Sequence, residues 1–289
     1  AIMIHPWNMM GMDKMNKYIF HSNALSDEQL TLIQAVFNQS PKLADGFYFL
    51  ESVESVELSA IRQQLSVDVN VLDAGFKGDQ VRLLVTDMDS TLISIECIDE
   101  IADMQGIKAQ VSAITEAAMR GELDFAASLT QRVALLKGLS ESSLQRVYNE
   151  RLRLNPGAEK LIAYLKQSSV KLALVSGGFT FFTEQLKQRL GLDYTLANTL
   201  EIRDGVLTGR VEGDIIGAQA KADLLLQLSY ELSLEKHQVI AMGDGANDLL
   251  MLDQAGLSVA YHAKPTVQAQ TAIQLNHSGL DAVIDLLKA

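Results

Sequence analysis

Residues 81–91 read VRLLVTDMDST, and this stretch decides the fold. Its apolar first half predicts a buried β-strand, and two carboxylates, Asp87 and Asp89, follow where that strand should end. In an extended chain both carboxylates would point the same way, because side chains repeat every second residue. Two like charges this close together are unfavourable unless a cation lies beside them. We therefore expect a divalent metal, a nucleophile and an acid/base group at one strand end.

A second strand end of the same kind lies far downstream. The apolar run VIAM at residues 239–242 leads into GDGAND at residues 243–248, where the carboxylates are Asp244 and Asp248. Two glycines there permit a tight turn. In an open parallel α/β sheet, ligands bind beyond the carboxyl ends of the strands. The two acidic strand ends therefore predict one shared site.

The composition excludes several classes of protein. The 289 residues include 24 basic and 36 acidic side chains, a formal charge of −12, whereas a nucleic-acid-binding protein needs a basic face. No apolar stretch has the length of a membrane span, and the N-terminus lacks the basic and apolar regions of a signal peptide. Cys97 is the one cysteine of the sequence, so no intrachain disulfide can form. We expect a cytoplasmic protein that binds neither nucleic acid nor membrane.

The pattern along the chain predicts three parts. Residues 1–15 are rich in methionine, and we expect a tail that is disordered or foreign to the natural sequence. Residues 16–80 have the alternating signals of a small α+β unit. Residues 81–289 alternate strands and helices, which predicts a mostly parallel sheet covered on both faces. Within this part, residues 98–155 show helical patterns alone and should form a lid over the carboxyl ends of the strands.

Local signals predict several element boundaries. Ser26 precedes a helical pattern as an N-cap, and Gly191 ends another helix. The dipeptide Asp204-Gly205 suits a tight hairpin turn. Residues 176–178, SGG, follow a strand that should end at Val175 and precede the next helix, so an ordinary tight turn is one alternative for them.

The residue types at the predicted site suit phosphoryl chemistry. Asp87 could attack phosphorus as a nucleophile, while Asp89 could protonate the leaving alkoxide and then deprotonate water. Ser176 and the backbone at Gly177 could bind a phosphoryl oxygen. Lys221, on a predicted helix, could balance the negative charge of the transition state.

The same residues predict a metal site. Mg²⁺ prefers oxygen ligands, and we expect these from Asp87, from Asp244 and from the backbone carbonyl of Asp89. Asp248 should act behind these ligands or through a water molecule. Mn²⁺ accepts the same hard oxygen ligands, so the sequence leaves the choice between the two ions open.

Taken in order, these residues resemble the four motifs of the haloacid dehalogenase superfamily of phosphatases. The motifs are DMDST at residues 87–91, Ser176, Lys221 and GDGAND at residues 243–248. The resemblance covers the chain from Arg82 to its C-terminus. It implies a Rossmann-like α/β core with a helical cap inserted after the first motif, and hydrolysis through an aspartyl phosphate on Asp87.

Within that superfamily the chain looks like the phosphoserine phosphatase family. In that family a glutamate shortly after the first motif reads the substrate ammonium, and Glu96 stands in that place. A cap arginine reads the substrate carboxylate, and Arg132 fits, because its planar fork can hold a carboxylate bidentately. Met119 and Phe125 are expected to line the pocket from the cap, and Asn247 to orient either the phosphate of O-phospho-L-serine or the groups around the metal. The implied role is the last step of serine biosynthesis.

The N-terminal unit resembles, more loosely, the ACT-like domain that precedes some bacterial members. ACT domains often bind amino acids and pair across dimers, so a homodimer through residues 16–80 is an expectation. A purely structural role for this unit stays open.

Two other functions stay open from the sequence. One is a phosphotransferase of the same fold that passes the phosphoryl group to a hydroxy amino acid such as homoserine. The other is an amino-acid-binding regulator with a vestigial phosphatase domain, against which the complete set of motif residues speaks.

Overall fold

The computed structural model describes residues 15–289, so the tail expected over residues 1–15 lies outside the described residues except for Met15. The described chain forms two compact units. One ends at Phe76 and also holds Ala289, and the other covers Lys77–Lys288. Within residues 15–289, no helix combines the length and the apolar character needed to cross a bilayer.

The smaller unit is an antiparallel sheet with two helices, as expected for a small α+β domain, and its strand order is β2-β3-β1-β4. Its first helix begins where the sequence predicted, because the Ser26 hydroxyl accepts the Gln29 N–H while the Gln29 side chain accepts the Ser26 N–H. The elements are β1 Asn16–Phe20, α1 Asp27–Phe37, β2 Lys42–Leu43, β3 Tyr48–Ser52, α2 Ser59–Leu65 and β4 Val69–Leu72.

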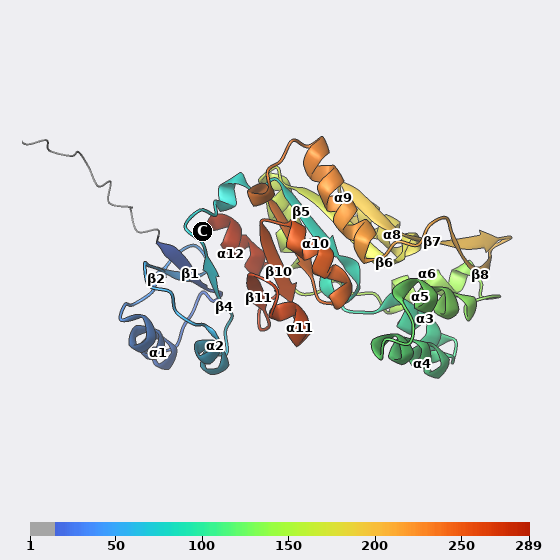
Figure 1. The fold of residues 1–289 in the computed structure, drawn as a ribbon, viewed down its shortest axis with the longest axis horizontal. Helices are drawn as coiled ribbons and strands as arrows, with labels where there is room; N and C mark the ends of the chain where they lie inside the picture. The colour runs from blue at the N-terminus through green and yellow to red at the C-terminus, as the bar shows by residue number, and fades with distance from the viewer. Residues whose placement is uncertain (1–14) are drawn as a thin grey trace, which may run out of the picture. The chain divides into compact units, whose positions relative to one another are not determined.

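The larger unit is built on a seven-stranded sheet in the order β11-β10-β9-β5-β6-β7-β8 (Figure 1). All neighbouring pairs are parallel except β7 with β8, which form an antiparallel hairpin. The chain runs outward from β5 through β6 and β7, and then returns to add β9, β10 and β11 on the other side. The strand order therefore reverses at β5, and ligands bind at such a switch point. The strands are β5 Leu83–Asp87, β6 Lys171–Phe179, β7 Tyr194–Arg203, β8 Val206–Glu212, β9 Val239–Gly243, β10 Leu257–Tyr261 and β11 Ile273–Leu275.

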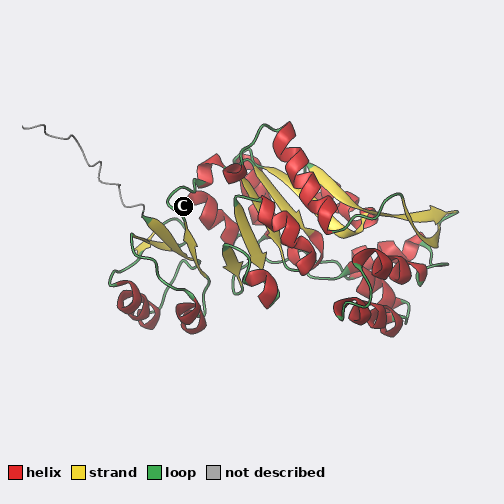
Figure 2. Ribbon diagram, viewed as in Figure 1, coloured by secondary structure: helices red, strands yellow, loops and turns green. Residues whose placement is uncertain are grey.

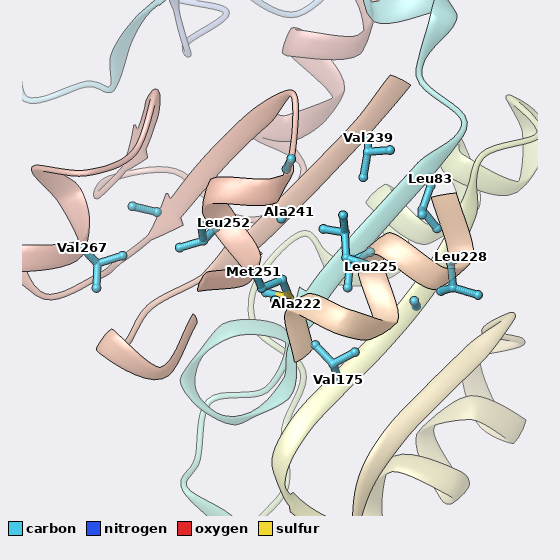
Figure 3. Packing of buried hydrophobic residues seen from close by; sticks show 14 of the residues in the cluster. Leu83, Val175, Ala222, Leu225, Leu228, Val239, Ala241, Met251, Leu252 and Val267 are labelled. Atoms are coloured by element: carbon cyan, nitrogen blue, oxygen red, sulfur yellow. The ribbon is translucent and has the colours of Figure 1, made fainter. Parts of the chain in front are cut away.

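Helices cover both faces of this sheet, as expected for parallel strands. On one face α9 and α10 pack their apolar side chains against β5, β6, β9 and β10, with Leu225 and Met251 buried in the cluster (Figure 3). Alternate strand residues such as Leu84 and Ile240 are equally buried, and α7 packs against β6. The helices of the core are α7 Ala158–Gln167, α8 Thr180–Leu190, α9 Ala218–Glu231, α10 Leu249–Gln254, α11 Pro265–Gln268 and α12 Ala282–Lys288.

The insertion between β5 and α7 is a cap of helices (Figure 2). Backbone hydrogen bonds tie it to the tip of the β7–β8 hairpin, from Gly138 N–H to the Leu207 carbonyl and from Glu141 N–H to the Gly205 carbonyl. The cap helices are α3 Cys97–Met104, α4 Lys108–Met119, α5 Phe125–Ala134 and α6 Glu141–Glu150.

One local expectation needs correction, and two elements were missed. The sequence ended this strand at Val175, but β6 continues to Phe179 with a register shift between Val175 and Phe179. The glycines there let the strand bend while it stays extended. The short β11 and the final helix α12 were not predicted, because their segments lack a clear periodic pattern.

Candidate active site

A cavity of about 320 Å³ lies in the larger unit where the strand ends meet the cap. Core and cap residues line it together, which matches the lid expected from the helical insertion. Ten residues named from the sequence line this cavity: Asp87, Asp89, Glu96, Met119, Phe125, Arg132, Ser176, Gly177, Asp244 and Asn247.

Asp87 is the last residue of β5, and a wide turn over Met88–Leu92 follows it. The turn is made possible by Ser90, whose φ of 58° lies in the left-handed region, sparsely used by residues other than glycine. At its end the Thr91 hydroxyl donates to Oδ1 of Asp244, at 3.2 Å. The first motif is thereby bonded directly to the last one.

Lys221 lies beneath the cavity and is fully buried. Its Nζ donates to Oδ1 of Asp87 at 2.6 Å and to Oδ1 of Asp248 at 2.9 Å. Burial opposes the charge of the ammonium, but the two carboxylates together raise the pKa of Lys221. It therefore carries a full positive charge next to the expected nucleophile.

The carboxylate of Asp248 fixes the backbone of the GDGAND loop through hydrogen bonds. Its Oδ2 accepts the N–H groups of Asp244 and Gly245, each at 3.1 Å. A Cβ at Gly243 would lie 2.4 Å from the same oxygen, so glycine is required there. Asp248 is fully buried, and both of its oxygens already accept hydrogen bonds from the chain.

The acidic residues around this point fit a divalent cation. One carboxylate oxygen from each of Asp87, Asp244 and Asp248 lies within 4.8 Å of the others, and such hard oxygen donors suit Mg²⁺ or Mn²⁺. Burial, with the charge of Asp248, raises the pKa of Asp87 against the pull of Lys221. Burial and Asp248 also raise the pKa of Asp244. A divalent charge at this place would relieve the crowding of carboxylates.

Asp89 stands two residues after Asp87, the expected nucleophile, and has a separate set of neighbours. Its Oδ1 accepts the N–H of Cys97 at 3.3 Å. Burial and the nearby Glu96 raise the pKa of Asp89 to about 7. A carboxyl group that titrates near neutral pH is suited to give and take a proton.

Ser176 and the following glycines form the third strand end. The Gly178 N–H donates to Oγ of Ser176 at 2.8 Å, so this N–H is bonded within the chain, and the expected contact of the Gly177 backbone with a phosphoryl oxygen stays a prediction. The serine oxygen thus accepts a hydrogen bond from the backbone, and its own O–H can still donate. A Cβ at Gly178 would lie 3.1 Å from Oδ2 of Asp89, which shows how closely the two strand ends approach.

The cap contributes groups of opposite charge. Glu96 precedes α3, and its Oε1 accepts the Ser90 hydroxyl at 2.5 Å. Arg132 reaches the cavity from α5, where its Nε donates to the Ser128 carbonyl at 3.3 Å. Phe125 begins α5 and lies against Gly177 of the core. Met119, at the end of α4, lines the cavity although its side chain is 70% exposed.

The sequence reading missed two charged residues that line the cavity, Asp99 and Lys264. Asp99 lies in the first turn of α3, three residues after Glu96, and this short spacing could have revealed it. Lys264 precedes α11, and its backbone N–H donates to the Asp244 carbonyl at 3.1 Å. No local signal marks it, because strand pairing brings it to the site.

Comparisons with known proteins agree with this geometry. The family model for haloacid dehalogenase-like hydrolases matches residues 84–253. A protein of Polaromonas sp. named phosphoserine phosphatase is 54% identical over 225 residues, which are 76% of this chain and 95% of that protein.

Solved structures give the same relationship. The chain is similar to the unliganded crystal structure of a probable phosphoserine phosphatase from Vibrio cholerae, with a TM-score of 0.82 and 39% identity over 96% of this chain and 87% of the other. It is also similar to a structure described as a phospho-aspartyl intermediate analogue of phosphoserine phosphatase. That match has a TM-score of 0.66 and 38% identity over 71% of this chain and 98% of the other.

Proposed function

Because this chain belongs to the phosphoserine phosphatases of the haloacid dehalogenase-like hydrolase family, we propose that it hydrolyses O-phospho-L-serine to L-serine and phosphate. The observation that carries the proposal is one cavity with two chemically distinct halves. The core half holds Asp87, Asp89 and Asp244, and the cap half offers Glu96 and Arg132.

The cap half suits an amino acid phosphate. Such a substrate has an ammonium group and a carboxylate in addition to its phosphate. Glu96 would pair with the ammonium, and the guanidinium of Arg132 would hold the carboxylate through two parallel hydrogen bonds. A sugar phosphate has neither charged group, so both residues would remain unpaired with it.

In the first step, an oxygen of Asp87 forms a bond to phosphorus while the bond from phosphorus to the serine oxygen breaks. Asp89 gives its proton to that oxygen, and L-serine leaves. In the second step, a water oxygen attacks the phosphorus of the aspartyl phosphate, Asp89 takes the proton of the water, and Asp87 is released with inorganic phosphate. The phospho-aspartyl analogue among the related structures supports this order.

The surrounding residues stabilise charge during both steps. Lys221 donates to Asp87 at 2.6 Å and would reduce the negative charge that builds up around the phosphoryl group. The Ser176 hydroxyl would donate to a phosphoryl oxygen, and Asn247, on the cavity wall, would orient the phosphate.

Asp87, Asp244 and the backbone carbonyl of Asp89 would hold Mg²⁺, with Asp248 behind them. When bound, the ion supplies positive charge that favours ionised Asp87 and polarises the phosphoryl oxygens. The cap would exclude bulk water while it covers the substrate.

Turnover with a panel of phosphomonoesters tests this function. Release of phosphate from O-phospho-L-serine should exceed release from sugar phosphates by at least tenfold in kcat/KM, should disappear with a chelator, and should return with Mg²⁺. Asp87→Asn should show no release with any substrate. Equal rates across the panel would refute the assignment of the substrate.

None of the relatives named above is a phosphotransferase, and no contact in the site favours transfer to homoserine over transfer to water. Pairing of the N-terminal units into a homodimer stays a prediction, to be checked by measuring the mass of the protein in solution.

A further inference from the structure

Asn198 on β7 is a buried polar residue that the reaction described above does not use. Its side chain is 1% exposed, yet it makes three hydrogen bonds. Nδ2 donates to the Gly177 carbonyl at 2.9 Å and to the Ile216 carbonyl at 3.1 Å, and Oδ1 accepts the Ile216 N–H at 2.7 Å. A buried side-chain amide is unfavourable unless it is hydrogen-bonded, and a bonded one makes the structure around it rigid. This side chain therefore joins two segments that each lead into the site.

The first segment is the end of β6. The Gly177 carbonyl and the Gly178 N–H belong to one planar peptide unit and point in opposite directions. Asn198 binds the carbonyl end, while the N–H end donates to Oγ of Ser176 at 2.8 Å. With its oxygen occupied in this way, Ser176 has its O–H available as a donor. Asn198 thus fixes the peptide that decides how the Ser176 hydroxyl can be used.

The second segment leads into α9. Asn198 pairs with both backbone groups of Ile216, the residue before Gly217, which is the N-cap of the helix. The Lys221 N–H then donates to the Gly217 carbonyl at 3.2 Å. The position of Ile216 therefore sets where α9 begins, and hence where the buried Lys221 ammonium lies.

The same two segments form the surface that the cap contacts. A Cβ at Gly177 would lie 2.8 Å from Cζ of Phe125, and a Cβ at Gly217 would lie 3.2 Å from its Cδ1. The ring of Phe125 therefore lies against two glycines that come from different segments. Asn198 is bonded to Gly177 itself and to the residue before Gly217, so it also sets the spacing of this glycine surface.

Resting on the proposed function, we infer that Asn198 is a positioning residue that locks the end of β6 to the start of α9. It thereby aligns the Ser176 hydroxyl and the Lys221 ammonium on the same phosphoryl group. It does not touch the substrate. The bonds it makes span three parts of the chain that the sequence separates by 18 residues or more.

Two substitutions test this role. Asn198→Asp has nearly the same shape but cannot donate to either carbonyl, and Asn198→Ala removes all three hydrogen bonds. Thr195→Val is the matched control, because Thr195 also lies on β7 and its hydroxyl bonds away from the site, to Glu184. Both Asn198 variants should lose about tenfold to 100-fold in kcat/KM with O-phospho-L-serine, as small misplacements of catalytic groups do. The control should stay within about twofold.

Two measurements on the metal-free protein do not depend on turnover. Inorganic phosphate should bind at least tenfold more weakly to the Asn198 variants than to the wild type. Hydrogen exchange should become faster in the segments around Gly177, Gly217 and Phe125, and stay unchanged in β9 and β10. Unchanged phosphate affinity together with unchanged exchange would overturn the inference, even if stability falls.

Failure of the proposed substrate and failure of the role of Asn198 give different results. If the wild type does not turn over phosphoserine, the proposed substrate fails, while phosphate binding and exchange still judge Asn198. If both variants fail to fold, the side-chain amide protons of Asn198 in the wild type are followed by NMR. Phosphate binding should slow their exchange, and an unchanged rate would refute the role.

Discussion

Nζ of Lys221 lies 2.6 Å from Oδ1 of Asp87, and this contact joins residues that are 134 positions apart in the chain. The same ammonium is 2.9 Å from Oδ1 of Asp248. One buried cation therefore holds two carboxylates from two different strand ends, and the site depends on it for both charge balance and shape.

Replacement of this lysine should affect both stability and catalysis. Lys221→Met would leave two buried carboxylates without their cation, and removing one partner of such a buried group costs about 3–5 kcal/mol. Urea denaturation should show a loss of this size in the free energy of unfolding, and kcat should fall by about 100-fold or more. Lys160→Met is the control, because Lys160 pairs with Asp281 on the surface and should cost less than about 1 kcal/mol. Equal losses for the two variants would contradict this account.

The proton affinity of Asp89 should depend on Glu96. Burial and then the negative charge of Glu96 raise the pKa of Asp89 to about 7. Removing a like charge favours the ionised carboxylate, so Glu96→Gln should lower the pKa of Asp89. Carbon-13 NMR of the side-chain carboxyl in the metal-free protein should record a midpoint near 7 in the wild type and a lower one in the variant. Glu100→Gln serves as the control, since Glu100 pairs with Arg151. A midpoint that does not move would show that Glu96 does not act on Asp89.

Arg132 should discriminate between substrates by their carboxylate. Phosphoethanolamine has the ammonium and phosphate of phosphoserine but no carboxylate. Arg132→Met should therefore raise KM for phosphoserine by about tenfold to 100-fold, the range expected when a bidentate ionic contact is lost, and leave KM for phosphoethanolamine nearly unchanged. Arg120→Met is a control within the cap, because Arg120 is exposed and bonded to Glu122. An equal rise in KM with both substrates would mean that Arg132 attracts the phosphate that both share and does not recognise the carboxylate.

The contact between the ring of Phe125 and Gly177 should leave no room for a side chain at position 177. A Cβ at Gly177 would lie 2.8 Å from Cζ of Phe125, so Gly177→Ala must displace the ring of Phe125 from its place in the cavity wall. We expect a loss in kcat/KM of about tenfold or more, partly restored when Phe125→Leu is added. Gly75→Ala, with open space around its Cβ position, should have no effect. Losses that simply add in the double variant would mean that the two residues do not interact.

The sequence allowed most of the fold to be predicted, because the deciding signals are local. Apolar runs of strand length defined β5 and β9, and Ser26 marked the start of α1 through a capping box. Asp204-Gly205 formed the expected hairpin turn between β7 and β8. The end of β6 was less predictable, since two consecutive glycines are compatible both with a turn and with a bent strand.

For the candidate site, the motifs allowed the types of residue and their order along the chain to be predicted. Which of these residues lie close together depends on the order of the strands in the sheet. Lys264 reaches the cavity because β10 pairs with β9, and Asn198 reaches Gly177 because β7 pairs with β6. Neither residue has a neighbour in the sequence that would single it out. Their importance depends on partners that are near in space and distant along the chain.

The sequence by itself determined the two acidic strand ends, the helical insertion and the α/β class, because periodicity and turn chemistry act over a few residues. The tertiary structure decided which hydrogen-bonding groups are still available for a substrate. The N–H of Gly178 is already bonded to Oγ of Ser176, and both oxygens of Asp248 already accept hydrogen bonds from the chain. Such occupancy follows from the packing of whole strands and helices, since each buried polar group must find its partner wherever the fold brings one within reach.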